Sequence, residues 1–121
     1  MPQKVAILGA SANLERYANK AFHMLQEYGH TPIPVNPGLK EIDQIPVVPR
    51  LQDIQEPIDT LTLYVNPELS SKLQDEILKL HPKRVIFNPG SENPNLQKTL
   101  ENKGIHTVQG CTLVLLRTKQ F

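Results

Sequence analysis

The sequence has little of what marks secreted, nucleic-acid-binding or membrane proteins. Its 121 residues include one cysteine, which excludes an internal disulfide framework and is compatible with a reducing compartment. The 13 basic and 12 acidic residues nearly balance, so the chain has no basic field for non-specific nucleic-acid binding. Its longest apolar runs, such as residues 5–8 and 113–116, are too short to cross a membrane. We therefore expect a cytoplasmic protein that contacts neither nucleic acid nor membrane.

Several signatures of catalytic and metal sites are also absent. The four histidines have no spacing typical of a zinc or iron site. The chain has neither the Gly-x-Ser-x-Gly turn of hydrolases nor the Gly-Lys-Ser/Thr loop that binds phosphates. Asp53 and Glu56 have no paired acid for hydrolytic chemistry. The sequence therefore names no catalytic group and no metal ligand.

Proline, by contrast, is in excess. The chain has 11, about 9% of its residues against a usual share of about 5%. Proline and glycine together make up about 14%, which is below the roughly 25–30% typical of disordered low-complexity chains. The hydrophobic fraction is 39%. We therefore expect residues 1–121 to fold as a single globular domain.

Short apolar segments alternate with segments of helical periodicity. Strands are predicted at 4–8, 31–35, 60–65, 84–87 and 105–108, and helices over 18–28, between Asn66 and Pro82, and between Asn93 and Gly104. Prolines at 32 and 34 remove ladder donors, so we expect the second strand to be short or irregular. Residues 36–57 are expected to form a long loop with a helical turn at 51–54. This alternation predicts an α/β fold: a single doubly wound Rossmann-like domain, with about five parallel strands flanked by helices on both faces.

Uncharged residues follow the first four predicted strands. They are Gly9-Ala10-Ser11, Asn36-Pro37, Asn66-Pro67 and Asn88-Pro89-Gly90. Ligands of doubly wound sheets bind outside the carboxyl ends of the strands, where the strand order reverses. These residues offer hydrogen bonds and closely approaching backbone but no general base. The pattern favours a site for a small-molecule nucleotide.

The turn at residues 9–14 occupies the position of the dinucleotide fingerprint but keeps only its first glycine. Ser11 stands at the second glycine and can offer a hydroxyl and an amide to a phosphate at the helix start. The alternative is an ordinary strand-to-helix turn capped by serine. Arg16 and Lys20 share one helix face, where they either neutralise a pyrophosphate or form a solvated surface.

Two further positions bear on the ligand. Asn36 stands where a typical NAD site has an acid that binds the ribose hydroxyls, which disfavours NAD. Cys111 follows the fifth predicted strand, where it faces a ligand or, as free cysteines usually do, is buried as a small hydrophobe.

Several short motifs occur in a recognisable order: Gly9-Ala10-Ser11, Glu15-Arg16, Tyr28-Gly29-His30, Pro34-Val35-Asn36-Pro37, Ile58-Asp59 and Gly104-Ile105. This order resembles the small stand-alone CoA-binding proteins over nearly the full chain. It is also similar to the N-terminal domain of ADP-forming acyl-CoA synthetases and of the succinyl-CoA ligase alpha subunit.

The resemblance implies a site for coenzyme A. NAD or NADP remains the alternative cofactor. The implied phosphate-binding residues are Gly9, Ala10 and Ser11, with Asn13 in the same turn and Arg16 and Lys20 nearby. Asn36 and Pro37 would lie beside the adenosine. The opposite wall would comprise Asn66, Pro67, Asn88 and Gly90. To these we add Lys40 as the cation for the 3′-phosphate.

The chain also departs from the family pattern. Residues 41–44 read Glu-Ile-Asp-Gln where the family often has a glycine, and the fourth strand ends in Asn88-Pro89 where glutamine is frequent. The ligase relatives carry further domains with a catalytic phosphohistidine, which these 121 residues do not contain. Our first hypothesis is therefore a CoA- or acyl-CoA-binding module without catalytic activity of its own.

Two other hypotheses remain open from the sequence. One is a small enzyme that uses NAD, NADP or CoA, with Cys111 or Tyr64 as its reactive group. The other is a nucleotide-binding partner subunit of a larger assembly, which would include a homo-oligomer.

Overall fold

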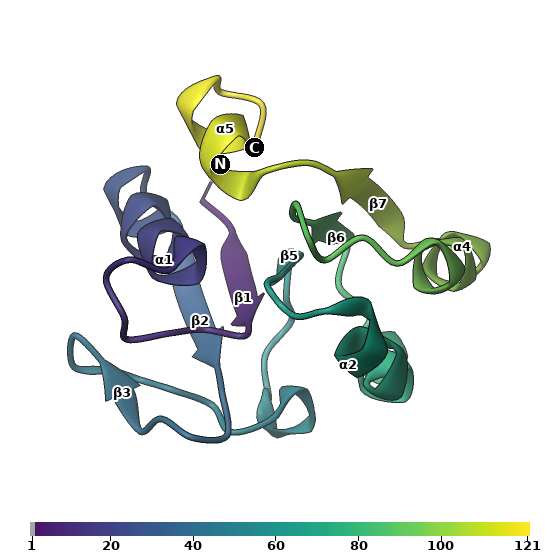
Figure 1. The fold of residues 1–121 in the computed structure, drawn as a ribbon, viewed down its shortest axis with the longest axis horizontal. Helices are drawn as coiled ribbons and strands as arrows, with labels where there is room; N and C mark the ends of the chain where they lie inside the picture. Colours follow the sequence, from purple (N-terminus) through teal and green to yellow (C-terminus); the bar gives the residue numbers. More distant parts are fainter. Residues whose placement is uncertain (1) are drawn as a thin grey trace.

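Five short strands pair side by side into a parallel sheet (Figure 1). The computed structural model describes residues 2–121. The sheet contains β1 (Lys4–Leu8), β2 (Thr31–Val35), β5 (Thr60–Leu63), β6 (Arg84–Phe87) and β7 (His106–Gln109), in the order β2-β1-β5-β6-β7. All four pairings are parallel. The predicted doubly wound α/β fold is confirmed.

Strand β1 shows how one sheet serves two cores. Successive side chains of a strand point to opposite faces of its sheet. Ala6 and Leu8 belong to a core that includes residues of α3 (Gln74–Leu80) and α4 (Pro94–Asn102). Val5 and Ile7 belong to a second core, with residues of α1 (Tyr17–Glu27) and α5 (Thr112–Arg117). Burial on both faces explains why this strand is continuously apolar in the sequence.

The prolines of β2 leave this strand regular, contrary to our expectation. All five of its residues pair in register with β1. The Thr31 N–H points toward β1 and donates to the Gln3 carbonyl. The Pro34 carbonyl points away from β1 and accepts from the Val48 N–H. The nitrogens of Pro32 and Pro34 therefore face away from β1. Their missing N–H groups cost no hydrogen bond of the sheet.

One predicted helix is in fact two. The segment between Asn66 and Pro82 forms α2 (Pro67–Lys72) and α3, which are separated at Leu73. Leu73 has φ −96° and ψ 7°, outside the α-helical range, so α2 ends there and α3 begins after it. Among residues 2–121, no helix has the length and apolar character needed to span a membrane.

The long loop between β2 and β5 is more ordered than predicted. The expected helical turn is present as the 3₁₀ turn η1 (Leu51–Asp53). Before it, β3 (Glu41–Ile42) and β4 (Ile45–Pro46) form an antiparallel hairpin that the sequence analysis missed. The two hairpin residues Asp43 and Gln44 have φ values of 47° and 68°. Positive φ at both positions is the geometry of a type I′ turn.

Candidate functional site

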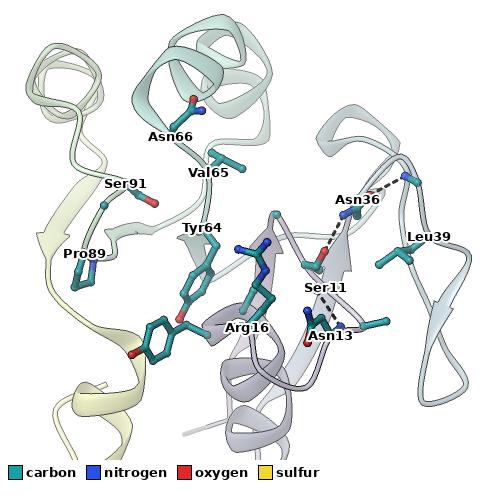
Figure 2. Close-up of a pocket in the computed structure, with 17 residues that line it drawn as sticks. Ser11, Asn13, Arg16, Asn36, Leu39, Tyr64, Val65, Asn66, Pro89 and Ser91 are labelled. Atoms are coloured by element: carbon teal, nitrogen blue, oxygen red, sulfur yellow. Dashed lines mark hydrogen bonds between the residues drawn. The ribbon is translucent and has the colours of Figure 1, made fainter.

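A hollow of about 770 Å³ lies at the carboxyl edge of the sheet, where the strand order reverses between β1 and β5 (Figure 2). We call it the loop pocket. Its walls come from the turn after β1, the loop after β2, and the segments that follow β5 and β6. The lining residues are Gly9, Ala10, Ser11, Ala12, Asn13, Arg16, Tyr17, Ala18, Asn36, Gly38, Leu39, Tyr64, Val65, Asn66, Pro89, Gly90 and Ser91.

A second hollow, of about 510 Å³, adjoins the first. We call it the proline pocket, because Pro37 and Pro49 form part of its wall. It shares Gly9, Asn36 and Val65 with the loop pocket. Its other lining residues are Leu8, Val35, Arg50, Leu51, Leu69, Leu73 and Glu76, so it is mainly apolar with one cation and one acid. The two pockets therefore lie side by side, with Asn36 in the wall of both.

Gly9 lets the ends of β1 and β5 approach closely. Its φ is +90°, and a Cβ placed on it would lie 2.7 Å from the Tyr64 carbonyl oxygen. The N–H groups of Gly9 and Ala10 both donate to the Val35 carbonyl at 3.2 Å. These two amides are engaged in the fold, so Gly9 and Ala10 form the floor of the turn.

The rest of the turn retains unused donors. The Ser11 hydroxyl accepts from the Asn13 N–H, and the Asn13 Oδ1 accepts from the Glu15 N–H, both at 3.0 Å. The backbone N–H groups of Ser11, Ala12 and Leu14 have no acceptor among residues 2–121. Successive free amides before a helix are a common anion-binding arrangement.

Arg16 adds a positive charge to this arrangement. Its side chain rises into the loop pocket between Tyr64 and Ser11 (Figure 2). It is the only charged residue of that lining, and it forms no ion pair within the described part of the chain. This end of the loop pocket is therefore suited to a phosphate group.

Asn36 joins the two pockets structurally. Its Nδ2 donates to the Ala10 carbonyl at 2.8 Å, and its Oδ1 accepts from the Gly38 N–H at 2.7 Å (Figure 2). The side chain thus fastens the turn after β1 to the loop after β2. An acid here could not donate to Ala10, which gives a structural reason for asparagine at this position.

A side-chain contact between His23 and Asp43 links the β3–β4 hairpin to α1. The Nε2 of His23 lies 2.5 Å from an Asp43 carboxylate oxygen, and its Nδ1 lies 3.1 Å from the Asn19 carbonyl. The contact between His23 and Asp43 fixes the hairpin that follows Leu39 in the pocket wall.

The opposite wall is polar but uncharged. Ser91 is only 4% exposed, and its hydroxyl has no hydrogen-bond partner among the described residues. Figure 2 shows this hydroxyl directed toward the side of the pocket where Val65 lies. It is free to bond a neutral polar group of a ligand.

Tyr64 is poorly suited to the role of reactive group. Its hydroxyl is buried beside Thr62 and Thr112 but forms no hydrogen bond of ordinary geometry with either. Burial raises the pKa of Tyr64 to about 12, so the phenol stays protonated near neutral pH. The lining of the loop pocket includes no acid, histidine or cysteine. Cys111 is half-buried and lines neither pocket.

The structure brings together most of the residues singled out from the sequence. The loop pocket is lined by Gly9, Ala10, Ser11, Asn13, Arg16, Asn36, Asn66 and Gly90, and the proline pocket by Asn36 and Pro37. Four residues line neither pocket: Lys20, Lys40, Pro67 and Asn88. The Lys20 ammonium lies over the Tyr17 ring, 5.3 Å from its centroid. Pro67 begins α2, where its missing N–H costs nothing.

Asn88 has a structural position instead. It is 1% exposed, and its Nδ2 donates to the Thr62 hydroxyl at 2.7 Å and to the Leu63 carbonyl at 2.8 Å. Its Oδ1 accepts from the Thr112 N–H at 2.9 Å. Because Thr62 accepts from Asn88, its hydroxyl proton is free to bond Thr112, 2.8 Å away. Asn88 thus joins β5, β6 and the start of α5.

Sequence reasoning missed Ser91, Arg50 and Glu76. Ser91 had a signal, because it directly follows the strand-end residues Asn88-Pro89-Gly90. Arg50 and Glu76 had none, because they reach the proline pocket from the long loop and from α3. Among residues 2–121, no three histidine, cysteine or acidic side chains are grouped to hold a metal ion.

Comparison with known proteins gives consistent matches over almost the whole chain. A family model described as a CoA binding domain matches residues 3–117. The uncharacterized protein YneT of Bacillus subtilis is 26% identical over 102 residues, which are 84% of this chain and 76% of YneT. The crystal structure of another uncharacterized protein has a TM-score of 0.95 at 41% identity, covering 100% of this chain and 99% of that one.

A larger protein shares the fold. The dinucleotide forming acetyl-coenzyme A synthetase 1 of Ca. Korarchaeum cryptofilum matches 88% of this chain with a TM-score of 0.74. The match covers 25% of the synthetase chain at 20% identity. This likeness concerns the fold alone.

Proposed function

Because the chain belongs to the CoA binding domain family, we propose that it binds coenzyme A or an acyl-CoA and has no catalytic activity of its own. The observation that carries this proposal is the loop pocket. It combines free backbone amides and Arg16 on one wall with neutral polar groups on the other. A ligand with an anionic centre and a long neutral arm matches this division.

Each part of coenzyme A has a suitable place along the two pockets. The pyrophosphate is suited to the free amides of Ser11 and Ala12 beside Arg16. The pantetheine arm carries two amide groups, which are suited to the neutral wall at Ser91. The adenine is suited to the apolar proline pocket, where Glu76 offers an acceptor to its amino group.

The absence of an acid, a histidine or a cysteine from the loop pocket lining supports a binding role rather than catalysis. Incubation with acetyl-CoA should therefore release no free thiol above the rate in buffer. Release that saturates with acetyl-CoA concentration would overturn this part of the proposal.

A cytoplasmic location is also part of the proposal, because the single cysteine is compatible with a reducing compartment.

A ligand panel tests the proposal directly. Thermal shift and calorimetry would compare CoA, acetyl-CoA, NAD, NADP, ATP and ADP. We expect CoA and acetyl-CoA to stabilise the fold by about 2.7 kcal/mol at a hundredfold excess over the dissociation constant. Stabilisation by NAD without any by CoA would contradict the proposal and favour a dinucleotide-dependent enzyme.

The phosphate site is tested by exchanging one cation. Arg16→Gln should weaken CoA binding about tenfold, because it removes a charge-assisted hydrogen bond from the pyrophosphate. Lys20→Gln is the matched control: it removes the same charge four residues farther along the chain, in the first turn of α1, but outside both pockets. It should change the affinity less than about threefold. An equal loss in both variants would mean that only the total positive charge near the start of α1 matters.

A further inference from the structure

The two pockets differ in their charged groups. Arg16 is the one charged residue of the loop pocket lining, whereas Arg50 and Glu76 belong to the proline pocket. Coenzyme A also carries two separate anionic groups, its pyrophosphate and the 3′-phosphate of its ribose. If Arg16 binds the pyrophosphate, the 3′-phosphate needs a second cation. That cation should lie in the proline pocket, where we place the adenosine.

We propose that Arg50 binds the 3′-phosphate and makes the site selective for CoA over dephospho-CoA. This inference rests on the proposed function. It also replaces Lys40, the cation we expected from the sequence, because Lys40 is exposed and lines neither pocket. Both residues lie in the loop after β2, but only Arg50 lines the proline pocket together with Asn36.

Backbone hydrogen bonds fix the position of Arg50 in the wall. The Val48 N–H donates to the Pro34 carbonyl at 2.9 Å, and the Asn36 N–H donates to the Val48 carbonyl at 3.0 Å. One residue beyond Arg50, the side chain of Leu51 is 2% exposed and belongs to the core. Arg50 is therefore held between two anchored residues, beside the strand end where the ribose is expected.

The guanidinium of Arg50 is available to a ligand. Within residues 2–121 it forms no ion pair, and Glu76 of the same pocket is not bonded to it. A ribose 3′-phosphate has a charge of about −1.5 to −2 near neutral pH, and arginine binds such groups through paired N–H donors. The carboxylate of Glu76 repels a phosphate, which confines the 3′-phosphate to the Arg50 side of the pocket.

The test compares CoA with dephospho-CoA, which has a hydroxyl in place of the 3′-phosphate, by calorimetry at one salt concentration. The wild-type protein should bind CoA at least about tenfold more tightly. Arg50→Gln should weaken CoA binding about tenfold and leave dephospho-CoA affinity within about twofold, so the preference is lost. Lys40→Gln, the matched control from the same loop, should keep the preference. Arg50→Lys, which keeps the positive charge, should retain part of the preference for CoA over dephospho-CoA.

Three results would overturn the inference: equal wild-type affinities for the two ligands, an equal loss for both ligands in Arg50→Gln, or loss of the preference in Lys40→Gln. An equal loss would place Arg50 against the base or the pyrophosphate. If the wild-type protein binds neither ligand, the proposed function itself fails, and the inference fails with it. Arg50 is exposed, so unchanged melting temperatures should show that all the variants are folded.

Discussion

Gly9→Ala should destabilise the protein by about 3 kcal/mol, since two costs combine at this position. The backbone has φ +90°, which is unfavourable for a residue with a side chain. The new Cβ would also lie 2.7 Å from the Tyr64 carbonyl and 3.0 Å from a Val65 methyl carbon. The carbonyl belongs to a neighbouring segment of backbone, so it cannot move away without disturbing the end of β5. Thermal unfolding should show a melting temperature lower by roughly 10 °C or more.

Gly104→Ala separates the two costs. Gly104, after α4, also has a positive φ, +81°, but no atom lies within 4 Å of a Cβ built on it. This variant should lose only about 1 kcal/mol. The difference between the two variants measures how closely the ends of β1 and β5 must approach beside the loop pocket. Equal losses would show that the backbone relaxes around the added methyl group.

Asn88→Asp should cost about 4 kcal/mol near neutral pH. The substitution keeps the shape of the side chain but replaces a buried donor with a charged acceptor. That acceptor would face the Leu63 carbonyl, which can only accept, at a site that is 1% exposed. Urea unfolding at pH 7 measures the loss. Asn95→Asp is the control: it makes the same exchange on an exposed residue of α4 and should change stability by less than about 0.5 kcal/mol.

The deficit of Asn88→Asp should shrink as the pH falls. Burial favours the neutral form of the introduced carboxyl, so the cost is present above the usual carboxyl range and fades toward about pH 4. A deficit independent of pH would mean that the site admits water or rearranges. Under conditions where the variant is folded, CoA affinity should stay within about twofold of wild type. A large selective loss of affinity would instead assign Asn88 to the ligand, as the family resemblance implied.

The sheet was predictable because local and tertiary signals agree there. The two Asn-Pro helix starts illustrate this: Asn66 accepts from the Leu69 N–H at 2.9 Å, and Asn93 accepts from the Leu96 N–H at 3.1 Å. In each case asparagine caps the helix and proline occupies its first turn. The family resemblance carried by the ordered motifs is likewise confirmed by the match over residues 3–117.

The β3–β4 hairpin was not predictable from the same signals. Type I′ turns are usually marked by Asn-Gly or Asp-Gly, because both central residues need positive φ. Here Asp43 and Gln44 fill these positions without a glycine, and the side-chain contact between His23 and Asp43 helps to hold them. That contact joins residues 20 positions apart and is not visible in any local pattern.

The candidate site was predictable where it follows the strand ends and unpredictable elsewhere. Ser11, Asn36 and Gly90 were found because the carboxyl edge of a parallel sheet gathers such residues. Arg50 was not, because its place depends on the return of the long loop to β2 through Val48. Lys40 precedes the hairpin and lines neither pocket, although it is closer to Asn36 in the sequence.

The outward-facing prolines of β2 also affect how the protein behaves in concentrated solution. An exposed edge strand can add a strand from another molecule, which leads to aggregation. Such pairing needs outward N–H donors, and Pro32 and Pro34 provide none. Farther along the same edge, Val48 already covers Val35 through a parallel bridge. The β2 edge is therefore closed to intermolecular sheet growth along most of its length, and this protection lies beside the strand end that forms the ligand site.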